Sequence, residues 1–403
     1  MKRIGIMIER QRAYGRRLCE GIVRFARDRE DWALEMLDWS DLEHAPRLDG
    51  YDGFIARVLD PRMADALART KRPVVDVFAD ALRPGFAAAD QDADAIARLA
   101  VRHFRDHLHT RFAFFGHEGR RYSDLRRDAF RRALEAEGLA CAVYATPERV
   151  MTRFNLDVMK LERYVSRGES RSIVAWLRKL EKPVAVFCSN DLRAYQLIAA
   201  CRDAGIAVPE DISVLGVDDD GLVCNFTHPP ISSVNPNAEG IGFAAAAELD
   251  RLLSGGRSPR HLTVAPTGLV ERLSSRAYAV EPAWVADALV FIRRSLANGI
   301  SAADVYRQSG RSHTIVNKGF QSAVGTTVQK TIAEMRLQEA LRLVTAGKST
   351  ATEIARLCGF ASVEYFTNSF TARFGKSPTA YQSFTGERPA SNSQSAQSHR
   401  HRT

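Results

Sequence analysis

Residues 354–381 read IARLCGFASVEYFTNSFTARFGKSPTAY, and this stretch decides the fold of the last third of the chain. Ile354 and Phe370 lie on either side of Gly359, a spacing that predicts a short helix, a turn and a second helix. The two apolar side chains would pack these helices together. An earlier stretch has the same pattern, so that Val305-x4-Gly310-x9-Phe320-x4-Gly325 is echoed by Ile354-x4-Gly359-x10-Phe370-x4-Gly375. The sequence therefore predicts two helix-turn-helix units.

Helical patterns fill the rest of this region. Residues 283–297 and 332–344 carry apolar residues at helical spacing, and the second segment lies between the two copies. Strand-like runs end before this helical region begins. We therefore expect a first domain over 1–275, a linker over 276–283 and an all-α domain over 284–386. Residues 387–403 are rich in Ser, Gln, His and Arg, a composition that predicts a disordered tail.

The first 275 residues alternate short apolar runs with amphipathic ones. Such alternation predicts parallel strands joined by helices that cover both faces of a sheet. The expected strands are Arg3–Ile8, Trp32–Leu37, Phe54–Val58, Val74–Phe78, Phe112–Phe115, Val184–Cys188 and Ser213–Val217. The expected helices are 15–29, 63–69, 93–108, 124–137, 170–180, 191–204 and one that begins at Ala238.

Positive charge is concentrated in the helical region. The 403 residues carry a net charge of +9, but residues 284–403 alone hold 15 Lys and Arg against 7 Asp and Glu, a balance of +8. The preceding residues therefore contribute only +1 (9 − 8). This distribution excludes a uniformly basic protein. It suggests a near-neutral body joined to a module that binds an anionic partner.

Other patterns narrow the class of protein. The chain has no run of 18 apolar residues that would predict a membrane span, and the apolar run at residues 4–8 ends in charges, without a small-residue cleavage site. The six cysteines show no CxxC spacing, which is typical of buried thiols in a reducing compartment. We therefore expect a cytoplasmic protein that has no membrane partner.

The second helix-turn-helix copy resembles the signature of AraC-type transcription regulators, IA…GF.S..YF…F….G.SP..Y, and has every anchor of it. The first copy is more divergent, but Ser312, Phe320 and Gly325 fit, and residues 336–343 fit the family's helix between the two motifs. The resemblance implies that the domain binds double-stranded promoter DNA, with two recognition helices in successive stretches of the major groove.

A recognition helix offers side chains from one exposed face. Base contacts are expected from His313, Thr314, Asn317 and Lys318 in the first unit and from Ser362, Glu364, Thr367 and Asn368 in the second. Asparagine can pair with adenine, and glutamate can accept from cytosine. Phosphate contacts are expected from Arg311, Lys348, Arg373 and Lys376. The alternative for each residue is that it only solvates a helix face.

The first domain resembles the sugar-binding core of LacI-type repressors and periplasmic binding proteins. The likeness rests on Ser189-Asn190-Asp191 after a strand, on residues 209–219 (PEDISVLGVDD) and on residues 229–234 (PPISSV). It implies a two-lobed α/β fold of type I with parallel sheets and a ligand between the lobes. We expect no LacI-type helix-turn-helix at the N-terminus, because Arg3–Ile8 is already the first strand.

Ligands of such sheets lie at the carboxyl ends of the strands. The candidate ligand contacts are Arg126, Asn190 and Asp218, which the resemblance implies, followed by Asp191, Glu9, Tyr14 and Arg16. Carboxylates, amides and guanidinium groups supply the donors and acceptors that a neutral polyol needs. A helix N-cap is the alternative for Asp218, and a surface ion pair for Arg126. Pro236 stands where the family often has Gln, which leaves the hinge-side contact open.

A LacI-like sensor and AraC-type motifs in one chain together resemble activators of sugar operons, and the likeness includes the first βα turn at residues 12–21 (RAYGRRLCEG). It implies a monosaccharide-responsive activator of a pentose (xylose-type) utilisation operon. It also implies a homodimer, with RNA polymerase as a further candidate partner. The alternative is a regulator of the same type that senses a different sugar or another small polar ligand.

An enzyme fused to a DNA-binding domain is a more distant alternative. The chain has no GxSxG, no GxxxxGK[ST] and no GxGxxG after its first strand. His103 and His107 could place two imidazoles on one helix face, but no HExxH glutamate accompanies them, so a solvated face is expected. We therefore expect no catalysis, no cofactor and no metal site.

Overall fold

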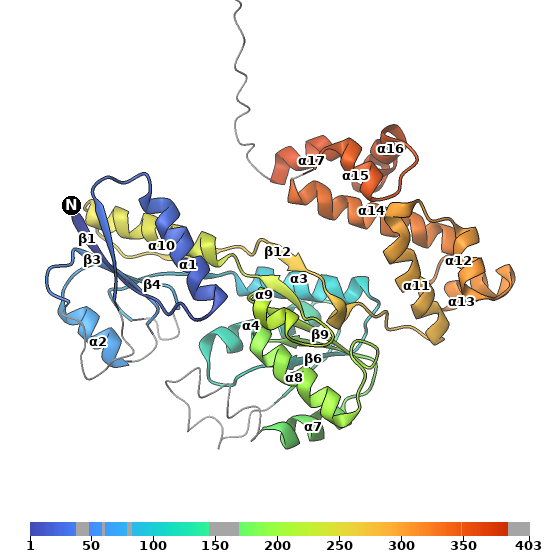
Figure 1. Cartoon of the computed structure of the whole chain (residues 1–403), viewed down its shortest axis with the longest axis horizontal. Helices are drawn as coiled ribbons and strands as arrows, with labels where there is room; N and C mark the ends of the chain where they lie inside the picture. Colours follow the sequence, from blue (N-terminus) through green and yellow to red (C-terminus); the bar gives the residue numbers. More distant parts are fainter. Residues whose placement is uncertain (38–47, 59–60, 79–82, 145–168, 348, 386–403) are drawn as a thin grey trace, which may run out of the picture. The chain divides into compact units, whose positions relative to one another are not determined.

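The computed structural model describes residues 1–37, 48–58, 61–78, 83–144, 169–347 and 349–385. The chain divides into two compact units, Met1–Ala279 and Val280–Thr403. The first unit contains the α/β part and the second the helical part (Figure 1). Lys348 and the tail expected over 387–403 lie outside the described residues. No helix in the described part of the chain is long and apolar enough to cross a membrane.

Two six-stranded sheets form the two lobes of the first unit. The first lobe has the strand order β11-β5-β4-β3-β1-β2, and every pair is parallel. Its strands are β1 (Lys2–Met7), β2 (Trp32–Met36), β3 (Gly53–Ala56), β4 (Val74–Asp76), β5 (Ala87–Gln91) and β11 (His261–Val264). Its sheet packs against helices α1 (Ala13–Ala26), α2 (Pro61–Arg69) and α10 (Ala238–Leu253).

The second lobe has the strand order β12-β10-β9-β8-β6-β7, in which only the β10–β12 pair is antiparallel. Its strands are β6 (Phe112–Phe115), β7 (Cys141–Val143), β8 (Val184–Cys188), β9 (Ile212–Val217), β10 (Ser232–Asn235) and β12 (Gly268–Val270). Its helices are α3 (Ala93–Asp106), α4 (Arg121–Glu135), α7 (Ser170–Lys179), α8 (Asp191–Ala204), α9 (Gly221–Asn225) and the short η1 (Leu273–Ser275). The central strands are buried throughout, which is why they appear in the sequence as continuous apolar runs.

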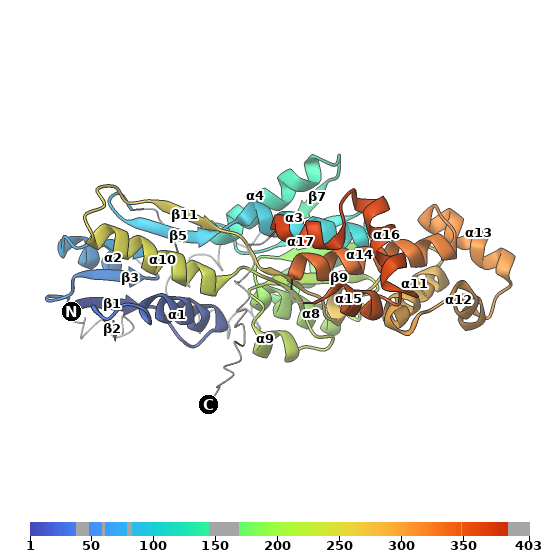
Figure 2. The same cartoon turned by 90° about the horizontal axis from the view of Figure 1, so that it is seen from above.

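The chain crosses between the lobes three times, at residues 91–93, 235–238 and 264–268 (Figure 2). The backbone N–H of Asp92 donates to Val264 (2.9 Å), and that of Thr267 donates to Asn235 (3.1 Å). Asn237, with a φ of +66°, caps α10 and donates from its side chain to the Ala265 oxygen at 3.1 Å. The asparagines beside Pro236 therefore hold the backbone of this hinge.

The strands and helices predicted for the first unit are all present, with ends that differ by three residues or fewer. Sequence patterns missed β5, β7, β11 and β12, and β10 was not among the expected strands either. The first of these reads AAADQ, which lacks the β-branched and aromatic residues that favour a strand. The second and third are partly exposed edge strands without a strong apolar pattern. Pairing with neighbours distant in sequence therefore decides these elements.

The second unit contains the predicted pair of helix-turn-helix motifs. Its helices are α11 (Ala283–Ser295), η2 (Leu296–Asn298), α12 (Ala302–Ser309), α13 (His313–Val324), α14 (Val328–Ala346), α15 (Ala351–Leu357), α16 (Val363–Phe374) and α17 (Pro378–Thr385). The apolar anchors of both copies are fully buried, and the turn glycines Gly310 and Gly359 have φ values of +63° and +69°. Capping boxes at Ser301–Asp304 and Thr350–Glu353 begin α12 and α15, so the repeat extends to the helix starts.

The segment expected as a linker begins inside the first unit. Ser274 and Ser275 are fully buried in the second lobe. The Tyr278 ring centroid lies 5.0 Å from that of His107, and the Ala279 N–H donates to the His107 oxygen at 3.0 Å. Residues 276–279 therefore contact the second lobe, and the two units separate only after Ala279.

The same segment overturns the expectation of a solvated face for His103 and His107. Both imidazoles are buried, because residues 274–279 cover this face of α3. Nε2 of His103 lies 2.7 Å from the Ser275 hydroxyl, and Nδ1 of His107 lies 2.8 Å from the His103 backbone oxygen. Among the described residues, no group of three or more His, Cys, Asp or Glu side chains is arranged to hold a metal ion.

His109 makes the first unit sensitive to acid. Its ring is buried edge-on against Phe104, with the two ring centroids 5.8 Å apart. Burial lowers the pKa of His109 to about 3. In the unfolded chain the pKa of histidine is about 6.5. Between these values the unfolded state binds the extra proton, so the free energy of unfolding decreases as the pH falls from about 6.5 toward 3.

At pH 5 this one histidine is expected to cost about 2 kcal/mol of stability relative to pH 7.5. His109→Phe retains an aromatic ring beside Phe104 and removes the titration. We expect the variant to lose about 2 kcal/mol less than the wild type between these pH values, as measured by urea unfolding. Equal losses in both proteins would contradict the assignment. Any packing change caused by the phenylalanine is the same at both pH values and cancels.

Candidate ligand cleft and nucleic-acid interface

Polar side chains gather where the strands of the second lobe end. Asp218 follows β9 with a φ of +112°, and its Oδ1 lies 3.6 Å from Nη2 of Arg126 on α4. Arg126 also donates to the backbone oxygen of Ser189 and to the side-chain oxygen of Gln91. Burial raises the pKa of Asp218, and the positive charge of Arg126 opposes that shift. The structure thus brings two of the predicted ligand contacts together.

The alternatives for these two residues do not fit the geometry. The N-cap of α9 is Asp220, whose carboxylate accepts from the N–H groups of Leu222 (3.1 Å) and Val223 (3.4 Å). Asp218 therefore does not cap this helix. Arg126 is only 2% exposed, so its contact with Asp218 is not a surface ion pair.

Three buried polar atoms, two in the second lobe and one in the first, have no hydrogen-bond partner among the described residues. They are Nε of Arg126, Oγ of Ser189 and Oε2 of Glu9. Buried polar atoms are normally paired, so such atoms point to a missing partner. A guanidinium N–H donates, a carboxylate oxygen accepts and a hydroxyl does both, so the set is complementary to the hydroxyl groups of a polyol.

The first lobe contributes a charged and aromatic group of its own. Glu9, which follows β1, forms an ion pair with Arg57 at the end of β3. The guanidinium of Arg57 lies 4.4 Å from the Phe78 ring centroid and 5.5 Å from that of Tyr14. Burial raises the pKa of Tyr14, which therefore stays protonated and can act as a hydroxyl donor. Glu9 and Tyr14 remain predicted ligand contacts.

Two aromatic rings meet where the lobes face each other. The ring centroids of Phe78, from the first lobe, and Tyr122, from the second, lie 6.1 Å apart. The Arg126 guanidinium lies 5.6 Å from the Tyr122 ring. Sequence reasoning missed Arg57, Phe78, Tyr122 and Gln91, although three of them follow or end a strand, which is the signal that identified Asp218.

Asn190 has a structural part in addition to its predicted one. Its Oδ1 caps α8 by accepting from the Arg193 N–H at 2.9 Å, and its Nδ2 lies 3.4 Å from the Tyr122 hydroxyl. The amide therefore joins the start of α8 to the aromatic group. Contact between Asn190 and a ligand stays a prediction.

Asp191 and Arg16 are placed differently from the other candidates. The Asp191 carboxylate is buried in the second lobe, where it accepts from the Ser233 hydroxyl (2.6 Å) and the Asp220 N–H (2.8 Å). Burial raises its pKa. Arg16 donates to the backbone oxygens of residues 10 and 11 at 2.9 and 3.0 Å. These contacts favour structural roles, Asp191 in joining β10 to α9 and Arg16 in fixing the β1–α1 turn.

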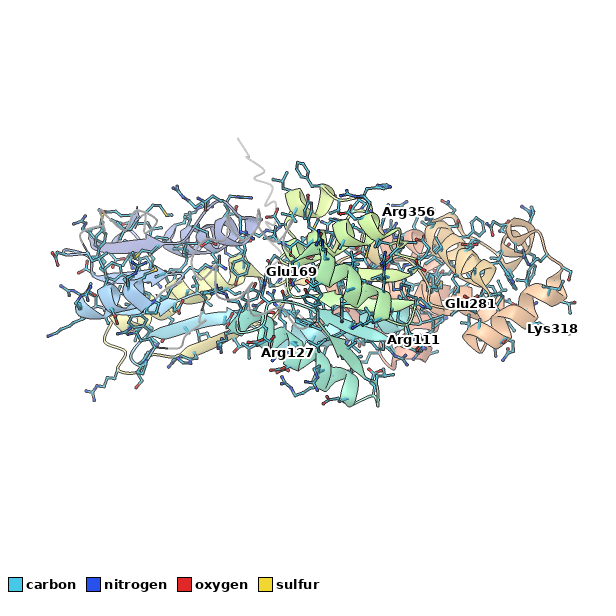
Figure 3. The ribbon with its side chains drawn as sticks, turned by 90° about the horizontal axis from the view of Figure 1, so that it is seen from below. Arg111, Arg127, Glu169, Glu281, Lys318 and Arg356 are labelled. Atoms are coloured by element: carbon cyan, nitrogen blue, oxygen red, sulfur yellow. The ribbon has the colours of Figure 1, made fainter. Side chains whose placement is uncertain are left out.

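A buried ion pair that no sequence pattern indicated supports the second lobe from within. Arg193 of α8 and Glu169 are both fully buried, and Nη1 of Arg193 lies 2.8 Å from Oε2 of Glu169. Figure 3 labels Glu169. Arg193 also donates to the Gly116 oxygen at 2.9 Å, and its guanidinium lies 3.9 Å from the Phe115 ring centroid. This pairing offsets the cost of burying the two charges and fixes the start of α8 against β6.

The first recognition helix, α13, exposes most of its predicted base contacts. His313, Thr314 and Lys318 are exposed, and Figure 3 labels Lys318 on this helix. Asn317 is half-buried and donates to the Tyr306 hydroxyl of α12 at 3.1 Å. The ring centroids of Tyr306 and His313 lie 4.1 Å apart. Tyr306 therefore orients two of the side chains expected to contact bases.

The second recognition helix, α16, presents Glu364 and Asn368 to solvent one turn apart. Hydrogen bonds from its own backbone N–H and from the Ser362 side chain lower the pKa of Glu364, so the carboxylate stays ionised and able to accept from cytosine. Ser362 is the N-cap, accepting from the Tyr365 N–H at 3.1 Å, and Thr367 is half-buried. Contacts with DNA remain predictions for all four residues.

Two of the predicted phosphate contacts have partners within the protein. Arg373 donates to Glu334 of α14 at 2.9 Å and so joins α16 to the central helix. The Arg311 guanidinium lies 5.0 Å from the Trp284 ring centroid and donates to the Ser309 oxygen at 3.0 Å. Lys376 is exposed. The geometry thus gives Arg373 a structural contact that its surface position did not predict.

Sequence reasoning passed over two exposed apolar residues on the recognition helices. Ile315 of α13 is 52% exposed and Tyr365 of α16 is 57% exposed. Apolar side chains at such positions can contact the methyl group of thymine. Apolar residues usually lie in the core, so neither is predicted as a DNA contact. The one sequence signal for exposure is that Ile315 follows Thr314 and Tyr365 follows Glu364.

Comparisons with known proteins agree with this division of the chain. Residues 101–275 match the family of the Periplasmic binding protein-like domain, and residues 305–383 match that of the Helix-turn-helix domain. The fold and these matches define a DNA-binding transcription regulator, with a periplasmic-binding-protein-like domain ahead of a helix-turn-helix domain of the AraC type.

Over nearly its whole length the chain is similar to the Xylose operon regulatory protein of Escherichia coli (strain K12), with 26% identity over 400 residues that cover 96% of this chain and 98% of the relative. The Xylose operon regulatory protein of Haemophilus influenzae (strain ATCC 51907 / DSM 11121 / KW20 / Rd) is 24% identical over 94% of this chain and 98% of its own. The solved structure of the xylose-binding transcription activator xylR matches 96% of this chain and 98% of its own, with 25% identity and a TM-score of 0.58.

The first unit alone also resembles LacI family regulators. One from Enterococcus faecium, solved with bound ribose, covers 68% of this chain and 98% of its own, at 18% identity and a TM-score of 0.53. At this identity the likeness shows the fold, which is the two-lobed architecture predicted from the sequence.

Proposed function

We propose that the first unit binds a neutral monosaccharide, a pentose of the xylose type, between its lobes, and that binding changes how the second unit engages promoter DNA. The observation that carries the proposal is the pair formed by the buried Arg126 and the partly buried Asp218, which follows the carboxyl end of β9. Unpartnered polar atoms of Arg126, Ser189 and Glu9 lie nearby. The names of the relatives, xylose operon regulators, point to the same ligand class.

The chemistry of the cleft suits an uncharged ligand. Asp218 and Glu9 are balanced by Arg126 and Arg57, so a charged ligand would leave one ion without its counter-ion. Hydroxyl groups both donate and accept, and can bond a carboxylate and a guanidinium at once. The Phe78 and Tyr122 rings offer apolar surface to the C–H face of a sugar ring.

The proposed regulator is an activator that acts in the cytoplasm as a homodimer, with RNA polymerase as a further partner. Its function would be binding and transmission of a signal, without catalysis. A sensor for another sugar or small polar ligand is the second candidate. One observation favours keeping it: Pro236 stands where the family often has Gln, and the asparagines on either side of it hydrogen-bond to the backbone of the hinge.

Two measurements, one on the full chain and one on a shortened variant, test the proposal. Calorimetry with a panel of pentoses and hexoses should show saturable binding of at least one sugar, with pentoses favoured. A variant that ends at Ala279 should retain sugar binding and lose DNA binding, because both recognition helices lie after this residue. The sensor assignment fails if no sugar binds while the full chain still binds promoter DNA.

A further inference from the structure

The segment that leads out of the first unit starts beside the proposed sugar site. Residues 271–279, called the exit strap here, follow β12 and end where the second unit begins. Ser274 in the strap donates to the Val214 oxygen of β9 at 2.7 Å and accepts from the Ser232 N–H of β10 at 2.9 Å. The Ser275 hydroxyl lies 2.7 Å from that of Ser232. The strap is therefore fastened to the two strands that end at the cleft.

One side chain joins the strap directly to the loop that carries Asp218. Nη2 of Arg272 donates to Oδ1 of Asp219 at 2.8 Å, and Nη1 donates to the Ile231 oxygen at 2.9 Å. Both partners are largely buried, with 18% and 12% of their side chains exposed. A partly buried pair of this kind is less screened by salt than a surface ion pair.

The same loop is held from the other lobe. Arg17 of α1 donates to the backbone oxygens of Asp218 and Asp219 at 2.9 and 3.0 Å. The Ala13 N–H, also of α1, donates to Asp220 at 3.2 Å. Asp218 and Asp219 both have positive φ values, +112° and +48°, which are uncommon for residues with a Cβ, and the Arg17 contacts hold the backbone in this conformation.

We propose that Asp219 is a positioning residue that couples closure of the lobes to the exit strap. The proposal rests on the sugar-sensing function above. When the lobes close, Arg17 fixes the backbone at 218–219, and this sets the Asp219 carboxylate where Arg272 binds it. When the lobes open, the Arg17 contacts are lost, and the strap is released from the loop. A ligand can shift an equilibrium only through contacts that differ between the two states, and these contacts differ.

The inference predicts variants that bind sugar but no longer respond to it. Asp219→Asn removes the charge and retains the side-chain shape and a residue type that tolerates positive φ. Arg272→Met removes the other partner. In each variant the sugar Kd should stay within about threefold of the wild type, because neither side chain supplies the Arg126–Asp218 pair. The sugar-induced change in DNA affinity, expected to be about tenfold or more in the wild type, should fall below about twofold.

The matched control is Arg276→Met. Arg276 lies in the same strap and pairs with Glu271 at 3.2 Å, away from the cleft. We expect this variant to respond to sugar as the wild type does. Asp219 also pairs with Arg17, at 3.8 Å, so Asp219→Asn can affect more than the contact with Arg272. The double variant Asp219→Asn/Arg272→Met should respond no worse than Asp219→Asn alone, because the contact that Arg272→Met removes is already lost in that variant. Thermal unfolding of all four proteins shows whether each is folded.

The outcomes separate the two proposals. Suppose that sugar changes the DNA affinity of the wild type, and changes that of Asp219→Asn and of Arg272→Met by the same factor. The coupling role is then overturned, and sugar sensing stands. If Arg276→Met loses the response as well, the strap matters in general and the role of Asp219 is overturned. If the wild type itself binds none of the sugars, the sensing function and this inference fail together.

Discussion

In the variant Asp218→Asn, sugar binding is expected to weaken by about 30- to 150-fold, equivalent to about 2–3 kcal/mol. The substitution removes the carboxylate charge that faces Arg126 at 3.6 Å. It leaves the buried guanidinium without its counter-ion and replaces one of two acceptor oxygens with a donor. Asparagine tolerates the +112° φ of this position better than alanine would, so the loop is expected to retain its shape.

Isothermal calorimetry with the best-binding pentose measures this effect, and gel shifts without sugar should show DNA affinity within about twofold of the wild type. Asp203→Asn is the control, because Asp203 is exposed and pairs with the neighbouring Arg202 on the surface. Its sugar affinity should not change. A loss for Asp218→Asn below about threefold would place the ligand away from this carboxylate.

Gly359→Ala is expected to abolish DNA binding by unfolding the second helix-turn-helix motif. A Cβ at this position would lie 1.9 Å from the backbone oxygen of Leu296 in η2, a distance that no rotamer change can relieve. The backbone also has a φ of +69°, which costs a residue with a Cβ about 1–2 kcal/mol. With the clash added, a loss of more than about 3 kcal/mol is expected in the unfolding of the second unit.

The first motif supplies the control for this variant. Gly310 occupies the equivalent turn with a φ of +63°, but a Cβ there would meet no atom within 4 Å. Gly310→Ala should therefore cost about 1–2 kcal/mol and retain DNA binding. Calorimetric unfolding and gel shifts compare the two variants, and sugar binding should be unchanged in both. Equal effects of the two substitutions would show that the Leu296 contact is unimportant.

Local patterns predicted the parts of the fold that local chemistry decides. The turn glycines, the apolar anchors Ile354 and Phe370, and the strand ends at Asp218 and Asn190 were all visible, because helical spacing and strand length are set by neighbours in the sequence. The two copies of the motif could be compared with each other, which made the second unit easier to predict than the first.

Long-range contacts decide what the sequence did not reveal. Asp191 follows a strand as Asp218 does, but the Ser233 hydroxyl, 42 residues away, binds its carboxylate in the lobe interior. His103 and His107 lie on a face that the polar pattern predicts as solvated, and residues 274–279 cover it. Arg373 is predicted to contact phosphate, and only the fold shows that it also pairs with Glu334.

The central helix α14 has a consequence for the DNA that this protein can recognise. Its 19 residues span about 28 Å, α13 and α16 both contact it, and the turn at Gly359 packs closely against the backbone of Leu296 in η2, which also contacts α14. One base pair inserted between the two half-sites would move one of them by about 3.4 Å and rotate it by about 35°. Because α14 has a fixed length, the separation of α13 and α16 cannot adjust to such a shift. Spacing, as well as base sequence, would therefore define the operator, and insertions or deletions between the half-sites would be less tolerated than substitutions there.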